Sequence, residues 1–174
     1  QDHAEARVLG GGRVLDPEGP KFGKSRNDRL YWLRALQLPD ATSALSRLLE
    51  AKKTINLSRF WAIRNHQSVP KNLFPNDDIR QFQRGDTLWA VAETQWQFVI
   101  QWLTKYVDHW HRERPKLSGV KIPSLQKEVA KSFDSALGHA ALDVLIRSGG
   151  LVLKEGYVSR KGFQPAKSQE ALQH

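Results

Sequence analysis

Four residues near the end of the chain could contact a nucleic acid: Lys154, Tyr157, Arg160 and Lys161. Lysine and arginine bind phosphate oxygens, and a tyrosine ring can stack on an unpaired base. The four fall within a short alternating apolar pattern that is typical of a β-hairpin. The tip of this hairpin is therefore a candidate RNA contact, although the same residues also suit a hairpin tip that is only solvated.

A second group of cations lies between residues 112 and 131. This segment contains six lysines and arginines and two glutamates, for a net charge of +4. This segment leads into an expected helix-turn-helix. Lys127 and Lys131 are its candidates for phosphate contact. An ordinary exposed helix surface is an equally good interpretation of the same charges.

A third group of cations lies in a stretch rich in proline and glycine, residues 16–27, which predicts a linker. Lys21, Lys24 and Arg26, followed by Arg29, make this linker basic. Such a linker would steer the protein toward ribosomal RNA or tRNA. Basic residues in linkers also serve solubility alone, so both interpretations stay open.

The sequence offers no arrangement for catalysis. The chain has no cysteine, which excludes zinc fingers, disulfides and thiol chemistry. The glycines at residues 10–12 match neither phosphate-loop pattern, so we expect them to end a strand or to permit a bend. His109 and His111 are two residues apart on an expected helix, where side chains diverge. We therefore predict no catalytic residue, no metal site and no bound cofactor in this chain.

Composition favours a partner that carries negative charge. Lysine and arginine outnumber aspartate and glutamate by 27 to 18 in 174 residues, for a net charge of +9. The simplest such partner is a nucleic acid. The sequence contains neither a membrane-length apolar run nor a signal peptide, so we expect a cytoplasmic protein that binds no membrane. Because the chain begins with Gln1 and lacks methionine, we expect a fragment of a longer protein.

The first half predicts two helices on either side of Pro39, with Asp40 as the N-cap of the second. Ile55 and Leu57 then alternate as in a short strand, and Ser58 is the expected cap of a short helix. A further helix around residues 69–74 is interrupted by a proline.

A hairpin closes this half. One arm carries Ile79 and Phe82, and the other carries Leu88 and Val91. The turn between them is Arg84-Gly85-Asp86.

The second half repeats this order. A long helix with one broad apolar face ends before Pro115, and a short strand leads into a helix with Pro123 in its first turn. Another helix, capped by Asp134, stops at Gly149. The final hairpin turns across residues 154–156.

We therefore predict a mostly α fold with small β-hairpins (α+β), made of tandem winged helix-turn-helix domains. The domains span residues 28–91 and residues 92–165, and residues 166–174 form a tail or begin a further domain. The repeat lies in the order of elements rather than in matching residues. The expected core of the second domain includes Trp96, Leu103, Leu125, Leu142 and Leu145.

The segment LGGGRVLDPEGPKFGKSRNDRLYWLRAL (residues 9–36) resembles a junction in bacterial selenocysteine-specific elongation factors of the SelB type. There the third domain, a β-barrel, gives way to a C-terminal extension through a glycine-rich strand end, a basic linker and a Leu/Trp helix. Residues 43–65, 87–91 and 141–163 resemble the first two of the four winged-helix domains in that extension. The resemblance implies that residues 1–15 are the end of the barrel domain.

The resemblance also implies what the parent protein does. Such a factor binds GTP with magnesium and delivers selenocysteinyl-tRNA to the ribosome at recoded UGA codons, directed by an mRNA hairpin. This fragment would be the arm that links the body carrying GTP and tRNA to the mRNA-binding tip. We expect it to bind neither GTP nor GDP, to contact RNA phosphates at most weakly, and to be a monomer. Residues of the GTP site and of the main mRNA site have no counterparts here.

Two other functions remain open from the sequence. One is a winged-helix transcription regulator that inserts the helix at residues 134–148 into a DNA major groove. Against it, that helix carries Asp134, Asp143 and a single cation, Arg147. The other is a protein-interaction module that uses its apolar surface.

Overall fold

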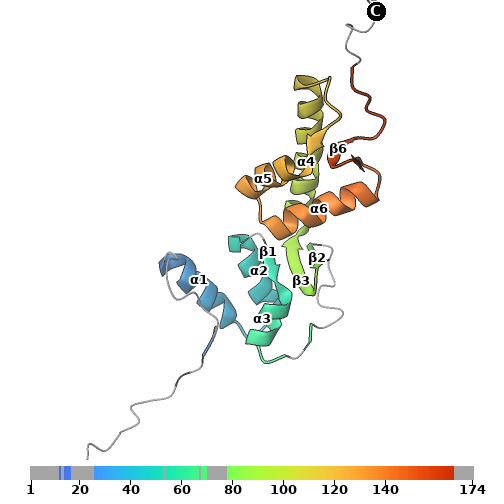
Figure 1. Cartoon of the computed structure of the whole chain (residues 1–174). Helices are drawn as coiled ribbons and strands as arrows, with labels where there is room; N and C mark the ends of the chain where they lie inside the picture. Colours follow the sequence, from blue (N-terminus) through green and yellow to red (C-terminus); the bar gives the residue numbers. More distant parts are fainter. Residues whose placement is uncertain are drawn as a thin grey trace, which may run out of the picture.

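Figure 1 shows the fold in a computed structural model, which describes residues 12, 14–16, 26–52, 54–66, 68–69 and 78–166. Helices and small antiparallel sheets mix in these residues, which confirms the coarse part of the predicted fold class. The first unit comprises α1 (Arg26–Leu36), α2 (Ala41–Lys52), β1 (Thr54–Asn56), α3 (Leu57–Ile63), β2 (Ile79–Arg84) and β3 (Thr87–Ala92). The second unit comprises α4 (Glu93–Glu113), β4 (Val120–Lys121), α5 (Ile122–Ser132), α6 (Ser135–Arg147), β5 (Leu151–Lys154) and β6 (Tyr157–Arg160).

Local signals fix most helix ends as predicted. The Asp40 carboxylate accepts a hydrogen bond from the Ser43 backbone N–H at 2.7 Å, which caps α2. Its hydrogen bonds with Ser43 hold the pKa of Asp40 below its usual value. Asp134 caps α6 in the same way, accepting from two backbone N–H groups at 2.8 and 3.4 Å. After α6 the backbone turns at Gly149, whose φ of +74° suits a glycine.

The start of α3 differs from the prediction. Asn56 caps this helix, because its Oδ1 accepts a hydrogen bond from the Arg59 backbone N–H at 2.8 Å. Leu57, expected in a strand, is instead the first residue of α3 and is fully buried, and Ser58 lies inside the helix. Asparagine and serine are about equally good caps, so composition alone could not choose between them. The helix expected around residues 69–74 falls almost entirely outside the described residues.

Both units contain a three-stranded antiparallel sheet with the same strand order, β1-β3-β2 in the first and β4-β6-β5 in the second. In each, the isolated strand pairs with the last strand of the hairpin. Gly85, with a φ of +57°, supplies the first hairpin turn as predicted. The second turn is narrower than predicted: only Glu155 and Gly156 form it, with φ values of +51° and +79°. Lys154 therefore belongs to β5 and pairs with Tyr157.

The buried apolar residues form two clusters, one for each unit. Phe60, Leu45 and Leu48 are fully buried in the first. The second contains all five predicted core residues, which are at most 8% exposed: Trp96, Leu103, Leu125, Leu142 and Leu145. This part of the prediction is confirmed.

The sheet of the first unit contributes to both cores. On β3, Leu88 and Ala90 pack against the first core, whereas Trp89 and Val91 pack against the second. The reason is that successive side chains of a strand point to opposite faces. On β2, Ile79 and Phe82 are three residues apart and therefore point to opposite faces. Ile79 packs against the first core and Phe82 against the second. The two arms of the hairpin are as predicted, with Ile79 and Phe82 on β2 and Leu88 and Val91 on β3.

Further contacts join the hairpin of the first unit to the second unit. The Phe82 ring stacks on Trp89 and also contacts Trp96 of α4, with ring centres 6.5 and 5.7 Å apart. Arg80 donates two hydrogen bonds to the Glu93 carboxylate, at 2.6 and 3.0 Å. Because β3 also runs directly into α4 (Figure 1), a packed sheet rather than a linker connects the two units.

Candidate nucleic-acid interface

Three residues from three strands lie side by side on the second sheet. Tyr157 of β6 pairs with Lys121 of β4 on one side and with Lys154 of β5 on the other. Directly opposite residues of antiparallel strands project from the same face. The Lys121 ammonium lies 5.9 Å from the centre of the Tyr157 ring, within cation–π distance. We call Lys121, Tyr157 and Lys154 the Lys–Tyr–Lys row.

The row lies on the outer face of the sheet. Val158, the next residue along β6, is fully buried in the second core, so Tyr157 points to the opposite side and is half-buried. Both lysines are exposed. Within the described part of the chain, neither lysine has a carboxylate at ion-pair distance. The row therefore presents an aromatic ring between two charges that no neighbouring acid neutralises.

The structure separates Arg160 from this row. The Arg160 guanidinium pairs with Asp108 of α4, with Nε and Oδ1 2.9 Å apart. Its backbone N–H donates a hydrogen bond to Nε2 of His111 at 3.2 Å. Arg160 therefore faces α4, on the inner side of the hairpin, and Lys161 lies exposed in the turn that follows. Of the four predicted hairpin residues, only Lys154 and Tyr157 come together.

His111 is buried behind this hairpin. The residue is 7% exposed, and its ring stacks on Phe163 with ring centres 3.5 Å apart. Because Nε2 accepts the Arg160 N–H, the neutral ring carries its proton on Nδ1, which has no partner among the described residues. Burial lowers the pKa of His111; Asp108 acts in the opposite direction but does not outweigh it. His109 is exposed, and the described ranges contain no group of three or more residues suited to bind a metal.

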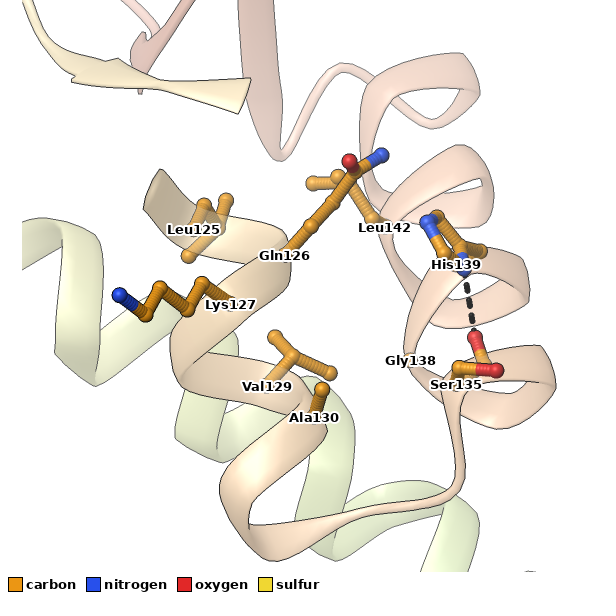
Figure 2. A pocket seen from close by; sticks show the side chains of 9 residues that line it. All are labelled: Leu125, Gln126, Lys127, Val129, Ala130, Ser135, Gly138, His139 and Leu142. Carbon is orange, nitrogen blue, oxygen red and sulfur yellow. Dashed lines mark hydrogen bonds between the residues drawn. The ribbon is translucent and has the colours of Figure 1, made fainter. Parts of the chain in front are cut away.

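Lys127 and Lys131 lie on exposed positions of α5. The Lys131 ammonium pairs with Glu128 at 2.7 Å, so its charge is partly neutralised. Lys127 borders a groove of about 280 Å³ between α5 and α6, and Figure 2 shows its ammonium directed away from α6. The groove is lined by Leu125, Gln126, Lys127, Val129, Ala130, Ser135, Gly138, His139 and Leu142. It is thus a mainly apolar depression in which no cation is positioned for a phosphate.

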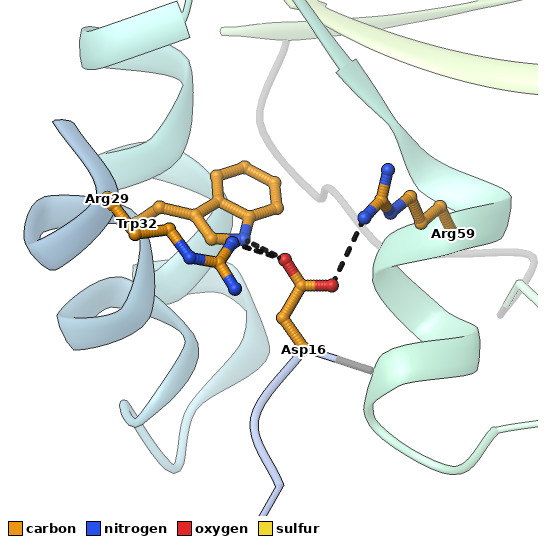
Figure 3. A network of polar contacts seen from close by, with 4 residues as sticks. All are labelled: Asp16, Arg29, Trp32 and Arg59. Carbon is orange, nitrogen blue, oxygen red and sulfur yellow. Dashed lines mark hydrogen bonds and ion pairs between the residues drawn. The ribbon is translucent and has the colours of Figure 1, made fainter. Parts of the chain in front are cut away.

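Of the predicted linker cations, Lys21 and Lys24 lie outside the described residues, and Arg26 is the first residue of α1. Arg29 is engaged inside the protein. Its guanidinium pairs with Asp16 (Figure 3), with Nη1 and Oδ2 2.6 Å apart. Arg59 of α3 contacts the other carboxylate oxygen at 3.1 Å, and the indole N–H of Trp32 donates to Asp16 at 3.1 Å.

Asp16 anchors the segment before α1 to the first unit. Its side chain is only 1% exposed. Burial would raise the pKa of Asp16, but hydrogen bonds from Arg29 and Arg59 outweigh that effect and lower it. Asp16, the first residue of the predicted linker, is thus fixed against α1 and α3. Asp16 and Arg59 are 43 positions apart in the sequence, a separation over which no local sequence pattern is informative.

The helix α6 is poorly suited to read bases. Its exposed positions include Asp143, Val144 and a single cation, Arg147. At its first turn, Arg84 of β2 donates a hydrogen bond to the Ser135 carbonyl at 3.3 Å, so the hairpin of the first unit lies against this end. A DNA-reading helix would need that end free.

Comparison with protein-family models and with curated proteins yields no match for this chain. No described helix has the length and apolar character needed to cross a membrane. The contribution of Lys121 to the row is the main site feature that sequence reasoning missed. The predicted domain type could have indicated it. In a winged-helix domain the isolated strand pairs with the last strand of the hairpin, and residue 121 lies in the predicted isolated strand.

Proposed function

We propose that the chain is a winged-helix arm of a selenocysteine-specific elongation factor of the SelB type. Each unit carries a sheet in which the isolated strand pairs with the last strand of the hairpin. In the second unit, the order α4, β4, α5, α6, β5, β6 supports the proposal of a winged helix. The resemblance of residues 9–36 to the junction in these factors supplies the family.

The observation that carries the proposed mechanism is the sheet that packs on both cores. One face of β2 and β3 lies on the first core and the other face on the second. Rotating one unit against the other would expose Phe82, Trp89 and Val91 to water. A flexible linker has no such cost, so it could not hold a fixed distance between two functional ends. The arm transmits position because its joint is part of the core.

The charge distribution supports a second, weaker role in contacting RNA. The chain carries a net charge of +9, and the Lys–Tyr–Lys row is an exposed basic site on its second unit. A transcription regulator is less well supported, because the exposed side chains of α6 include few that could read base edges. A protein-interaction module would use the apolar groove between α5 and α6, for which the described residues suggest no specific partner.

Distance measurements between two spin labels test the rigid joint. Since the chain has no cysteine, Gln37→Cys and Lys116→Cys provide two unique, exposed attachment sites, one in each unit. We expect a single narrow distance distribution. The double variant Phe82→Ala/Trp89→Ala should broaden it, whereas Tyr157→Ala, on the second hairpin, should not. A broad distribution in the unsubstituted protein would contradict the rigid arm.

A genetic test addresses the family. The complete reading frame that encodes this chain should contain GTP-binding motifs upstream of Gln1. Expressed in bacteria that lack their own factor, it should restore decoding of UGA in a selenocysteine reporter. The Phe82→Ala/Trp89→Ala change should lower that decoding when it is compared at equal amounts of folded protein. Failure of the unsubstituted gene to restore any decoding, with the matching tRNA and mRNA hairpin supplied, would reject the family.

A further inference from the structure

We propose that the Lys–Tyr–Lys row binds one unpaired nucleotide of an RNA strand, with the base stacked on Tyr157 and the adjoining phosphates bound by Lys121 and Lys154. This inference rests on the RNA-contacting role proposed above and names the part of the RNA that is recognised. It also revises the residues involved. Lys121 joins the site, and Arg160 leaves it, because Arg160 is paired with Asp108 on the other side of the sheet.

The geometry favours a nucleotide over a simple anion. Neighbouring strands lie about 4.8 Å apart, so the two lysine Cα atoms flank the tyrosine at roughly equal distances on either side. A sulfate or an isolated phosphate would need only the cations. A strand of RNA offers alternating phosphates and bases, and an aromatic ring between two cations matches both features.

The carboxylates near the row leave it basic. Glu155 follows Lys154 in the hairpin turn and is exposed, with its backbone at a φ of +51°. Asp108 lies beyond the sheet and is occupied by Arg160. The row therefore keeps an excess of positive charge, which opposes binding of an acid-poor apolar protein surface and favours a polyanion.

Unpaired RNA is favoured over duplex RNA. In a duplex each base is already stacked between its neighbours, and its face is not available to a side chain. Aromatic side chains stack on bases that are splayed out in loops, bulges and single strands. A duplex could contact the two lysines through its phosphates but would gain nothing from Tyr157.

The test is a binding titration, followed by fluorescence anisotropy, with the whole chain. The probes are a labelled single-stranded RNA, a duplex RNA that contains the same strand, and a duplex DNA. Tyr157→Leu should weaken single-strand binding by roughly tenfold, the effect of losing one stacked base. It should leave duplex binding unchanged. Tyr157→Phe should retain the binding, because the ring remains.

The lysines are tested by salt dependence. Lys121→Ala and Lys154→Ala should each flatten the plot of log affinity against log salt for the single strand by about 0.7. The matched control for charge is Lys105→Ala, an exposed lysine on α4, and the matched control for the ring is Phe98→Leu, which is 55% exposed. Neither control should change single-strand affinity by more than about twofold, a threshold well below the stacking effect. Circular dichroism and thermal unfolding verify that each variant is folded.

The outcomes separate this inference from the broader proposal. If Tyr157→Leu leaves single-strand affinity unchanged while Lys121→Ala and Lys154→Ala weaken binding to all RNAs alike, the stacking site is wrong and phosphate contact by the arm stands. If the chain prefers one DNA duplex over every RNA, the elongation-factor proposal itself fails. If no RNA binds the chain and another protein buries the Lys–Tyr–Lys row, the row is a protein contact and the inference is overturned.

Discussion

The hairpins of the two units share a topology but face different surroundings. At the same register position, the first sheet has Asn56 opposite Trp89 and Trp89 opposite Phe82. The second sheet has Lys121 opposite Tyr157 and Tyr157 opposite Lys154. In both, an aromatic residue occupies the central strand. The first row packs against the next unit through Phe82 and Trp96, whereas the second row is open.

This difference shows how one sheet face can serve two purposes. A buried aromatic residue beside Trp89 makes the first face an internal joint, since ring-to-ring contact and loss of water favour burial. Lysines beside Tyr157 oppose burial, because an ammonium removed from water needs a partner. The flanking residues, not the strand order, therefore decide whether the outer face joins the two units or remains open to solvent.

The largest expected effect contrasts the two rows directly. Phe82→Ala should destabilise the protein by about 3–5 kcal/mol, because it removes a ring that is 9% exposed from the packed joint. Tyr157→Ala, at the open row, should cost far less, because its ring is only half-buried. Urea denaturation of the two variants measures the difference. Equal losses would mean that the second row is also a structural joint.

Asp16 supplies the next largest effect and concerns the other side of the first unit. Asp16→Ala should lower the free energy of unfolding by roughly 1–3 kcal/mol, because hydrogen bonds from two arginines and an indole are lost. It should also expose the segment before α1 to protease. Asp86→Ala, an exposed acid in the first hairpin turn, is the control for charge. Unchanged stability and proteolysis would show that the segment is not anchored by this residue.

Most of the described helices could be predicted because their signals are local. Asp40, Asp134 and Gly149 act within a few residues, and the apolar spacing of the second unit identified its core. The joint could not be predicted as easily. Its existence depends on which face of β3 each residue occupies, and the two partners of that strand come from separate parts of the chain.

The candidate site was predicted only in part, because some of its residues are close in the sequence and others are brought together by the sheet. Lys154 and Tyr157 could be found because they lie in one hairpin, where the turn fixes their pairing. Lys121 lies 36 positions before Tyr157, and only the sheet brings it alongside. Arg160 was grouped with the others by proximity in sequence, but alternation along β6 directs it to α4.

A smaller effect should appear in the pH dependence of stability, which reports on the inner side of the second hairpin. The folded protein lowers the pKa of His111, so the unfolded chain binds a proton at higher pH than the folded one. The contribution of His111 is therefore complete above its ordinary pKa of 6.5 and is lost as pH falls through the folded value. Because Asp16 has a lowered acid pKa, its contribution persists until pH falls below its ordinary value of 3.8.

Measuring the free energy of unfolding between pH 8 and pH 4.5 separates the contribution of His111 from that of Asp16. As pH falls through this range, titration of His111 should lower the free energy of unfolding by at most about 1.4 kcal/mol per pH unit. His111→Gln should remove that slope component, whereas His109→Gln, at an exposed position, should keep it. A slope that survives in His111→Gln would assign it to other groups.

The smallest expected effect compares the two faces of the second hairpin itself. Arg160→Ala removes an ion pair whose side chains are 42% and 40% exposed, so it should cost between zero and about 1 kcal/mol of stability. Lys154→Ala, on the outer face, should change stability by less than about 0.5 kcal/mol, because the side chain is exposed and has no ion pair among the described residues. In RNA binding the order should reverse, with Lys154→Ala flattening the salt dependence and Arg160→Ala leaving it nearly unchanged, since Asp108 already neutralises that arginine. Thermal unfolding and salt titrations on the same two proteins measure both quantities. If Arg160→Ala weakened RNA binding as much as Lys154→Ala, the ion pair with Asp108 would have to open on binding, and the division between an inner structural face and an outer binding face would not hold.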